Sequence, residues 1–531
     1  MKIEKIPYQQ TGRFAKVVTD YLHADEQLKP FYKYTPDLNS FREVMQGKLQ
    51  EQIDGNLLAD TLLQQYGGLE INPLVAANID SFRNKNTFCL VTAHQLNIFT
   101  GPLYVIYKTI STIQLCLTLK EKYPENNFIP VFWLGSEDHD FAEINHFSLF
   151  NKTYTWEGVQ GGACGKYDPK SLASIITELT PVLGENEHAQ YLISLFTKAY
   201  SGSKNLSDAT RVILNGLFGD KGLVVVDGDD INFKSPCASI IEEEIFNRSS
   251  EKLVNQTLAI FPYEAQATPR EINLFYLKDH LRERIILDAA TGNYSVLNSS
   301  IGFTKDQIKT EIQTHPERFS PNVILRPLFQ QKVLPSLAYI GGGGELAYWL
   351  QLRSLFEHHQ IQMPVLLLRD SYLIIDSNTG RKMQKLHLSV SDIFKEENSL
   401  INDFVKTNSP ESVSLATEIA EIGIIFNRIL EAAKKIDTSL DKTVLGERQN
   451  VLNGLQKLEA KLLKAEKTKM DAEVGQIRTV LGKLFPNGGL QERHDNFITY
   501  YLKYGQNFFD HLLTSAGQPK PEFTILSLDE A

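Results

Sequence analysis

The stretch FIPVFWLGSEDHD at residues 128–140 joins an apolar run to a cluster of ionisable side chains. A run of this kind is typical of a strand buried on both faces, and such strands belong to parallel sheets that helices cover on both sides. The acidic residues and the histidine follow at the end of the strand, where open α/β sheets bind their ligands. This stretch therefore predicts the fold class and the place of a site together.

Four further apolar runs occur along the chain, at residues 87–92, 223–226, 336–340 and 364–368. Helical stretches separate them, as in the segment after Gly101 and Pro102 where apolar residues recur at helical spacing. This alternation predicts an α/β protein with a doubly wound parallel core. We expect residues 1–85 to be helical and polar, and residues 231–320, whose signals are mixed, to form an insertion between core strands.

The C-terminal part has a different pattern. Its apolar residues step by four and three as in a heptad seam, which predicts a coiled coil; they are Val451, Leu455, Leu458, Leu462 and Ala465. A second seam continues out of phase, so a stutter or bend is expected within residues 464–473. We interpret this part as an arm used for dimerisation, and the alternative is a helix packed along its own core. The predicted domains are a core at 1–385, a helical arm at 386–490, and a C-terminal helix and tail at 491–531 that pack back on the core.

Composition limits the partners and the compartment. The chain has 531 residues and a formal net charge of −10, which argues against a nucleic-acid partner because such partners need a basic face. No apolar run approaches the roughly 20 residues of a membrane span, and the N-terminus has no secretory signal. The four cysteines lie far apart without a C-x-x-C pair, which favours reduced, buried thiols. We expect a cytoplasmic protein that has no membrane partner.

The loop after the apolar run at 87–92 holds the first candidate binding residues. It leads into a helix, and the free N–H groups of a helix start favour an anion such as phosphate or carboxylate. Donors nearby would add to this site; the candidates of the loop are His94, Gln95, Asn97, Gly101 and Tyr104. Ordinary loop and capping chemistry is the alternative.

The cluster after residue 134 holds the candidate catalytic residues, which are Glu137, Asp138, His139 and Asp140. Charges beside a buried strand must be paired or solvated, so packing alone does not explain them. Three roles compete: a general base for an attacking amine, ligands for Mg²⁺ that bridges nucleotide phosphates, and ligands for zinc. Zinc is disfavoured because no partner cysteine or zinc spacing is present, and we predict no dedicated metal site. A capped helix start with surface acids is the alternative.

A glycine run follows the apolar run at 336–340. Strand, glycines and helix together let backbone amides approach a ligand closely; the residues are Gly341, Gly342, Gly343, Gly344 and Glu345. The run is not a dinucleotide fingerprint, because Leu346 stands in the place of the third glycine, and it is not a P-loop. Arg326 is a further candidate, since its planar fork can hold a carboxylate or phosphate, although a structural ion pair is the commoner use.

Five motifs together resemble the family of bacillithiol biosynthesis cysteine-adding enzymes, the cysteine ligases. They are FTGPLYVIYK at 99–108, PVFW at 130–133 followed by EDHDF at 137–141, Arg326-Pro327, GGELAYW at 343–349 and LQER at 490–493. Their order and spacing fit over nearly the whole chain. Two departures stand out: TAHQ at 92–95 replaces the family's T-G-Q-Q, and GGGE at 342–345 replaces its G-P-G-E.

The resemblance implies a Rossmann-like core with connecting-peptide insertions similar to those of class I aminoacyl-tRNA synthetases, and a C-terminal α-helical coiled-coil domain that makes a homodimer. The implied reaction joins the carboxyl group of cysteine to the amine of glucosaminyl-malate, the last step of bacillithiol biosynthesis. It implies ATP, with or without Mg²⁺, because a free carboxylate must be activated as an acyl-adenylate or acyl-phosphate. We assign residues 94–104 and 341–345 to the phosphates, and Asp138, His139 or Asp140 to deprotonating the amine.

Two other functions stay open at this point. One is a nucleotidyltransferase-like enzyme that activates an amino acid for another amine. The other is a dimeric nucleotide-binding scaffold without catalysis. The gathering of polar residues at strand ends disfavours the scaffold, because a dead site has no reason to keep them.

Overall fold

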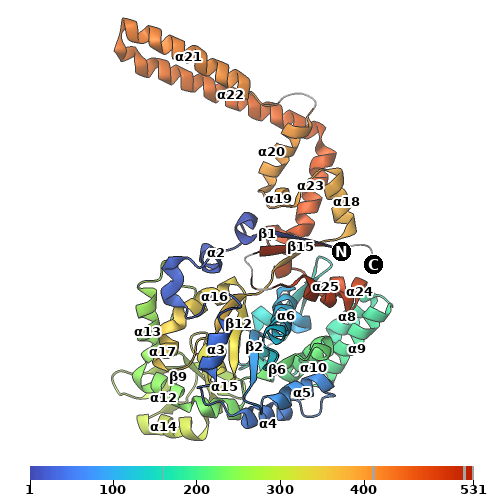
Figure 1. Ribbon diagram of the computed structural model, residues 1–531, viewed down its shortest axis with the longest axis vertical. Helices are drawn as coiled ribbons and strands as arrows, with labels where there is room; N and C mark the ends of the chain where they lie inside the picture. Colours follow the sequence, from blue (N-terminus) through green and yellow to red (C-terminus); the bar gives the residue numbers. More distant parts are fainter. Residues whose placement is uncertain (159–160, 410–412, 518, 520–521, 529–531) are drawn as a thin grey trace.

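The computed structural model describes residues 1–531 except 159–160, 410–412, 518, 520–521 and 529–531. A rounded body carries a long helical arm (Figure 1). The centre of the body is a parallel sheet of five strands in the order β13-β12-β2-β3-β6. These strands are β2 (Thr87–His94), β3 (Asn127–Leu134), β6 (Val224–Asp227), β12 (Ser336–Gly341) and β13 (Val365–Leu368).

The strand order confirms the predicted doubly wound, Rossmann-like core. Counted along the chain, the five strands lie in the order 3-2-1-4-5, which is that of a dinucleotide-binding fold. The order reverses between β2 and β12, so the two connections leave these strands in opposite directions. Ligands bind at such a switch point, and both the loop after β2 and the glycine run after β12 begin there.

Both faces of the sheet are buried, as the apolar runs predict. Leu90 of β2 packs in one core with α3 (Phe41–Lys48) and the end of α6 (Tyr104–Lys122). Its neighbours Cys89 and Val91 pack in the main core on the other face. Helix α6 connects β2 to β3 and is buried along most of its length. A strand covered on both sides leaves only its ends for chemistry.

The N-terminal region is mostly helical, with one strand that we did not predict. The helices are α1 (Tyr8–Thr11), α2 (Lys16–Leu22), α3, α4 (Gly55–Gln65) and α5 (Pro73–Ser81). Residues before them form β1 (Lys2–Pro7), which pairs antiparallel with β15 (Glu522–Ser527). Strand β14 (Tyr372–Ile375) pairs parallel with β15 and completes this second sheet. The expectation of helix was wrong here because the partner of β1 lies at the other end of the chain.

The connection from β3 to β6 is long and mainly helical. It consists of α7 (Phe141–Ile144), the hairpin β4 (His146–Leu149) and β5 (Lys152–Thr155), and the helices α8 (Ala173–Leu183), α9 (Glu187–Gly202) and α10 (Leu206–Phe218). Helix α10 packs on β6 and on α9.

The predicted insertion between β6 and β12 contains a sheet of its own. Its helices are α11 (Ile231–Lys234), α12 (Ala238–Asn247), α13 (Ser249–Leu258), α14 (Lys305–Thr314) and α15 (Arg326–Val333). Its antiparallel strands, in the order β10-β9-β8-β7-β11, are β7 (Leu274–Lys278), β8 (Leu281–Leu287), β9 (Tyr294–Val296), β10 (Gly302–Phe303) and β11 (Phe319–Pro321). After β12 come α16 (Gly343–Trp349) and α17 (Arg353–His358).

The arm confirms the predicted helical coiled-coil part. Its helices are α18 (Ser377–Lys385), α19 (Val390–Ile393), α20 (Glu397–Asn408), α21 (Ala416–Ile436), α22 (Asp441–Lys469) and α23 (Asp471–Leu484). Helices α21 and α22 lie side by side as a hairpin at the tip (Figure 1). The predicted bend falls at Met470, which separates α22 from α23.

The chain returns to the body after the arm. The single C-terminal helix that we expected within residues 491–531 is two helices, α24 (Ile498–Tyr504) and α25 (Asn507–Ser515). Gly505, with φ of 56°, breaks the helix between them. Helix α24 contacts α9 and α25 contacts α6, so this part packs on the core.

Candidate active site

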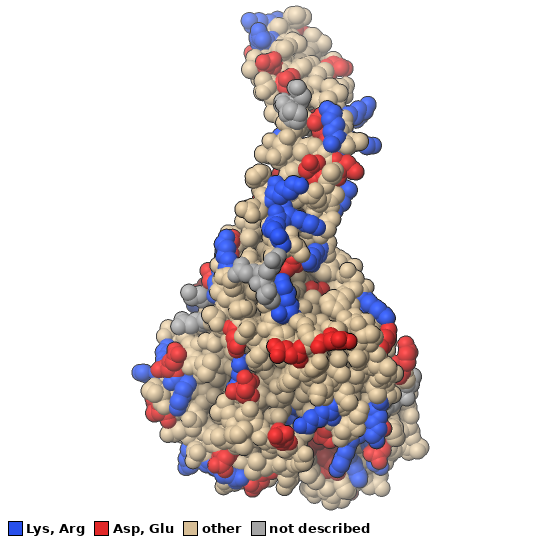
Figure 2. Space-filling view, turned by 90° about the vertical axis from the view of Figure 1, so that its right-hand side faces the viewer, with Lys and Arg blue, Asp and Glu red and all other residues tan. Residues whose placement is uncertain are grey.

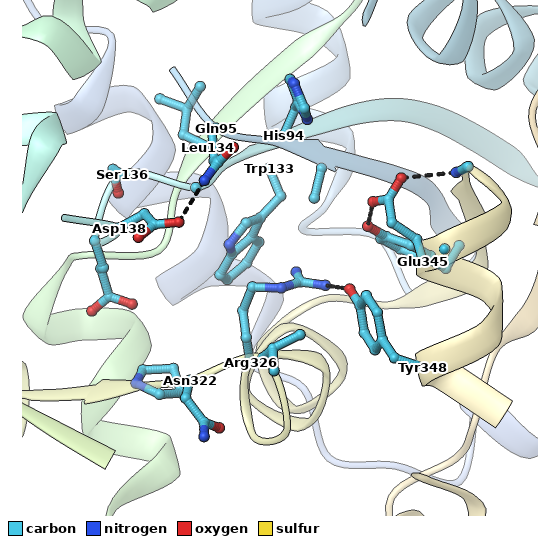
Figure 3. Close-up of a pocket in the computed structure, with 18 of the residues that line it drawn as sticks. His94, Gln95, Trp133, Leu134, Ser136, Asp138, Asn322, Arg326, Glu345 and Tyr348 are labelled. Carbon is cyan, nitrogen blue, oxygen red and sulfur yellow. Dashed lines mark hydrogen bonds between the residues drawn. The ribbon is translucent and has the colours of Figure 1, made fainter. Parts of the chain in front are cut away.

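One cavity of about 640 Å³ lies where β2, β3 and β12 end (Figure 3). It brings together eleven of the residues predicted from four separate segments: His94, Gln95, Tyr104, Glu137, Asp138, His139, Arg326, Gly342, Gly343, Gly344 and Glu345. Four predicted residues are not part of its wall, namely Asn97, Gly101, Asp140 and Gly341. The glycine run and the acidic cluster therefore share one cavity, which is the arrangement that the switch point predicts.

Asp138 is held at one side of the cavity by its neighbours. Its carboxylate accepts a hydrogen bond of 2.7 Å from the side-chain amide of Gln95, and another from the backbone N–H of His139. Burial alone would raise the pKa of Asp138, but the Gln95 amide and the charge of Arg282 bring it below the usual value. Asp138 is therefore an oriented, ionised carboxylate. Gln95, which we predicted as a substrate-binding or nucleotide-binding residue, uses its side-chain amide to hold Asp138.

His139 is oriented by an arginine that the sequence did not reveal. The Nη1 of Arg282 lies 2.7 Å from Nδ1 of His139. Since arginine only donates, Nδ1 must accept, and the neutral ring then carries its proton on Nε2. In this arrangement His139 has a hydrogen to give to a ligand and no free lone pair, so it is a donor and not a base.

Glu137 and Asp140 take structural positions. The carboxylate of Glu137 pairs with buried Lys234, which also contacts Asp229 at 2.9 Å. Burial raises the pKa of Glu137 although Lys234 opposes that effect. Asp140 caps α7 by accepting from the backbone N–H of Glu143. Of the four acidic-cluster residues, Asp138 alone offers an ionised oxygen to the cavity.

The end of β2 contributes a neutral histidine. Burial, with the positive charges of Lys108 and Arg369, lowers the pKa of His94 to about 3. The ring of His94 lies against Tyr104, with 3.4 Å between Nε2 and the phenol oxygen. His94 therefore serves as an uncharged hydrogen-bonding group. Asn97 donates to the backbone oxygen of Glu143 at 2.9 Å and so shapes the loop rather than the cavity.

Glu345 anchors the glycine run. Its carboxylate accepts from the backbone N–H of Gly342 at 2.8 Å and pairs with buried Lys108 at 2.7 Å. Burial opposes ionisation, but Lys108 and this N–H lower the pKa of Glu345 to about 2. A side chain at Gly341 would come within 3.0 Å of Tyr339 and Glu345, which explains a glycine at the strand end. The charge of Glu345 is thus used inside the protein, and the backbone of residues 342–344 faces the cavity.

Arg326 faces Asp138 across the cavity, with the ring of Trp133 between them in the view of Figure 3. It donates to Gln330 at 2.9 Å and to the Tyr348 hydroxyl at 3.3 Å, and both partners are neutral. Within the described part of the chain, no carboxylate lies within ion-pair distance of it. A half-buried cation with neutral partners retains its attraction for an anion.

Several lining residues were missed. The cationic ones are Arg270, Arg282 and Arg493, and the aromatic ones are Trp133, Phe275, Tyr339 and Tyr348. Arg369 also lines the cavity; it follows the apolar run at 364–368, where the sequence indicates either a clamp for a carboxylate or phosphate or a structural ion pair. Arg493 lies in the LQER motif, so a signal existed for it. Arg270 and Arg282 belong to the insertion and carry no local signal, because its antiparallel sheet brings them to the cavity. The guanidinium of Arg282 lies 4.0 Å from the ring centre of Phe275.

The acidic residues after β6 are used structurally. Asp227 accepts from the Ser136 hydroxyl, Asp229 pairs with Lys234, and Asp230 caps α11. In the described ranges no three side chains of histidine, cysteine, aspartate or glutamate gather as metal ligands. Nor does any helix described here combine the length and the apolar character needed to cross a membrane.

Comparisons with known proteins match nearly the whole length of the chain. Residues 1–370 match the family model described as bacillithiol biosynthesis BshC, N-terminal Rossmann-like domain, and residues 372–528 match that of its C-terminal coiled-coil domain. A protein of Flavobacterium psychrophilum is 40% identical over 530 residues, which is 99% of each chain. A Flavobacterium johnsoniae protein is 39% identical over 99% of this chain and 100% of its own. A Christiangramia forsetii protein is 40% identical over 98% of each. All three are named "Putative cysteine ligase BshC".

Proposed function

This chain belongs to the bacillithiol biosynthesis BshC family, and we propose that it joins the carboxyl group of cysteine to the amine of glucosaminyl-malate. One observation carries the proposal: the cavity places the ionised carboxylate of Asp138 opposite the unneutralised guanidinium of Arg326. The acceptor has an amine at one end and two carboxylates at the other. A cavity with opposite charges on its two sides matches a molecule of this kind.

The amine end of the acceptor belongs at Asp138. Its carboxylate attracts the ammonium form, and Gln95 fixes the oxygen that receives the proton. When the amine has given up that proton, its lone pair attacks the activated carbonyl carbon. The new carbon–nitrogen bond forms as the bond from that carbon to the leaving phosphate oxygen breaks. His139 can donate its Nε2 hydrogen to an oxygen of either substrate.

The malate end belongs at Arg326 and the wall of the insertion. The planar fork of arginine holds a carboxylate by two parallel hydrogen bonds. Arg282 of the insertion lies nearer Asp138, with 3.9 Å between its Nη1 and a carboxylate oxygen, and it is held by Ser320 at 3.0 Å and by the oxygen of Pro321. The fork of Arg326 would select an acceptor with carboxylates over a simple amino sugar.

The residues present also fit an ATP phosphate group, which supplies the energy to activate the cysteine carboxyl. The backbone of residues 342–344 is open to the cavity, and the helix start at Tyr104 adjoins it. Lys108 and Glu345 neutralise each other there, so they hold the loop without repelling a phosphate. We assign the nucleotide to this end of the cavity and leave the opposite end to the acceptor.

The test is a reconstituted reaction followed by mass spectrometry. The purified full-length chain is incubated with cysteine, glucosaminyl-malate, Mg²⁺ and ATP, and bacillithiol is measured. Omission of ATP should abolish the product, and glucosamine should not replace glucosaminyl-malate. In cells, deletion of the gene should remove bacillithiol and accumulate glucosaminyl-malate. Product formation without ATP would contradict the activation step, and an unchanged thiol profile would contradict the ligase and favour another amine or a scaffold.

We also propose that the arm makes a homodimer. The tip hairpin leaves isoleucines open on α21, with Ile424 58% and Ile429 44% exposed, and Leu458 of α22 is 48% exposed. Figure 2 shows basic and acidic side chains along the arm with uncharged surface between them. Apolar residues at heptad spacing that one hairpin does not bury are covered when a second copy packs against it.

The oligomeric state tests this part of the proposal. Light scattering after size exclusion should give twice the mass of the chain for the wild type and one chain mass for the double variant Ile424→Glu, Ile429→Glu. Leu117→Glu is the matched control, because Leu117 is a 52% exposed leucine on the body. A wild type that runs as one chain would contradict the dimer.

We assign the reaction to the cytoplasm. All four cysteines are free and buried, in keeping with a reducing compartment. The product would itself be a thiol that such a compartment keeps reduced. A fluorescent fusion that stays in the cytosol fraction after cell breakage and sedimentation is the expected result, and recovery with the membranes would contradict it.

A further inference from the structure

The segment at residues 490–496 joins the arm to the body and reaches the cavity. It follows α23 and precedes α24, and it carries the LQER motif, to which no role has been assigned above. The family models place it in the coiled-coil part, whereas the rest of the cavity belongs to the Rossmann-like part. Arg493 of this segment lines the cavity. The cavity is therefore built from both parts of the chain.

Two neighbours of Arg493 are anchored on the strand side of the segment. Glu492 is fully buried, and its two oxygens accept from Nη1 and Nη2 of Arg369 at 2.9 and 2.6 Å. Gln491, which is 2% exposed, accepts from the backbone N–H of Ile374 at 2.9 Å. Bidentate, buried pairing of this kind fixes both position and direction. The backbone on the N-terminal side of Arg493 is thus held rigidly.

The other side of Arg493 is anchored on the loop after β2. Fully buried Asn496 donates to the backbone oxygens of Phe99 and Gly101 at 2.9 and 2.7 Å. The oxygen of Asp495 accepts from the N–H of Leu103 at 2.8 Å, at the start of α6. Phe99 and Thr100 both have positive φ, at 51° and 68°, a costly conformation that neighbouring contacts must stabilise. The segment thereby fixes the loop that carries Tyr104.

Arg493 differs from these anchors. It is exposed, and among the residues described it has no ion pair or hydrogen-bond partner for its guanidinium. The other two cations at this end of the cavity are already neutralised, Lys108 by Glu345 and Arg369 by Glu492. Arg493 is thus the cation left available beside Tyr104. An ordinary surface arginine needs no such set of buried anchors on both sides.

We propose that Arg493 is a substrate-binding residue, contributed by the root of the arm, that takes an anionic oxygen group at the β2–β12 end of the cavity. The inference rests on the proposed function, in which two substrates of the cavity carry such groups: the phosphates of the nucleotide, which is assigned to this end, and the carboxylates of the acceptor. Arginine binds either group through the same planar fork. The shared chemistry is the pair of anionic oxygens.

Titration calorimetry on the full-length chain tests the inference with two probes, inorganic pyrophosphate and L-malate. Arg493→Gln should weaken the binding of one probe at least tenfold and leave the other within about twofold; the affected probe identifies the source of the group. Arg493→Lys should recover only part of the loss, because an ammonium lacks the fork. Arg42→Gln is the matched control, since Arg42 is an exposed arginine on α3 outside the cavity.

The outcomes separate this inference from the function it rests on. If Arg493→Gln binds both probes like the wild type while Arg326→Gln loses malate, the role of Arg493 is refuted and the proposed acceptor site stands. If the wild type binds neither probe, both are refuted. An equal loss in Arg42→Gln would show a general charge effect and would also overturn the inference.

Discussion

The cavity of about 640 Å³ at the carboxyl ends of the strands has a counterpart of about 690 Å³ at the opposite end of the sheet, where Thr87 begins β2 and Pro335 precedes β12. The counterpart also contains charged residues, but its buried lysine, Lys48, pairs with Glu51 at 2.8 Å. In the first cavity Arg326 has only neutral partners and Asp138 faces the open space. The two volumes are similar, so the difference that marks a site is a half-buried cation, Arg326, left without a charged partner.

The largest effect is expected at Asp138. Asp138→Asn keeps the shape but removes the group that accepts the proton of the amine, and general bases contribute roughly 10²–10⁴ in rate. We therefore expect kcat to fall by about that factor, measured as bacillithiol formed per unit time. Asp140→Asn is the control, because Asp140 caps α7 outside the cavity and should leave kcat within about threefold. Equal losses of kcat in the two variants would contradict the assignment of Asp138 as the group that accepts the proton.

Removal of the positive charge of Arg326 should have the next largest effect. Hydrogen bonds to charged groups contribute about 1.5–3 kcal/mol, so Arg326→Gln should raise the KM for glucosaminyl-malate by roughly 10–150-fold. The change in kcat should be smaller, since Arg326 lies away from the reacting amine. Steady-state kinetics with the acceptor varied will show this. An unchanged KM would mean that the positive wall does not bind the acceptor.

Glu345 gives a prediction on pH. Its folded pKa of about 2 lies below the usual 4.5, so its contribution to stability is complete above pH 4.5 and is lost as the pH falls toward 2. Linkage converts this difference to about 3 kcal/mol of unfolding free energy. Denaturant unfolding at pH 6 and pH 3 should therefore show a smaller stability loss for Glu345→Gln than for the wild type. Equal losses would show that the pairing with Lys108 does not depress this pKa.

The smallest effect is expected at the counterpart cavity. Arg83 forms ion pairs with Asp60 at 2.6 Å and Asp80 at 3.0 Å, and such exposed pairs contribute about 0.2–1 kcal/mol. Arg83→Gln should lower stability by no more than that and leave kcat and KM within about twofold. A large loss of activity would show that this end of the sheet also takes part in function.

The sequence predicted the parts of the site that strand ends supply. Residues 134–139 and 342–345 follow apolar runs, and parallel strands carry their ends to one edge, so their meeting follows from the fold. Arg282 lies on an antiparallel strand of the insertion, and no local pattern says which way that sheet faces the core. The same limit applies to Glu492 and Asn496, whose partners lie more than 100 residues away.

Sequence patterns also do not determine the tautomer of His139 or the ion-pair partner of Glu137. Each depends on a single contact with a residue of another element: Arg282 for His139 and Lys234 for Glu137. Hydrophobic periodicity does not show which elements pack together. The adjacent acidic residues look equivalent in the sequence. Burial and pairing give them different tasks: Asp138 faces the cavity, Glu137 pairs with a lysine, and Asp140 caps the start of α7.

The small sheet β1-β15-β14 has a consequence for synthesis on the ribosome. Strand β1 leaves the ribosome long before β15, its strand partner within the described part of the chain, which ends at Ser527. At roughly 5–20 residues per second, the first strand waits on the order of half a minute or more before that partner exists. Its exposed edge must be tolerated or shielded throughout, so this small sheet closes only after all the residues between β1 and β15 have been made.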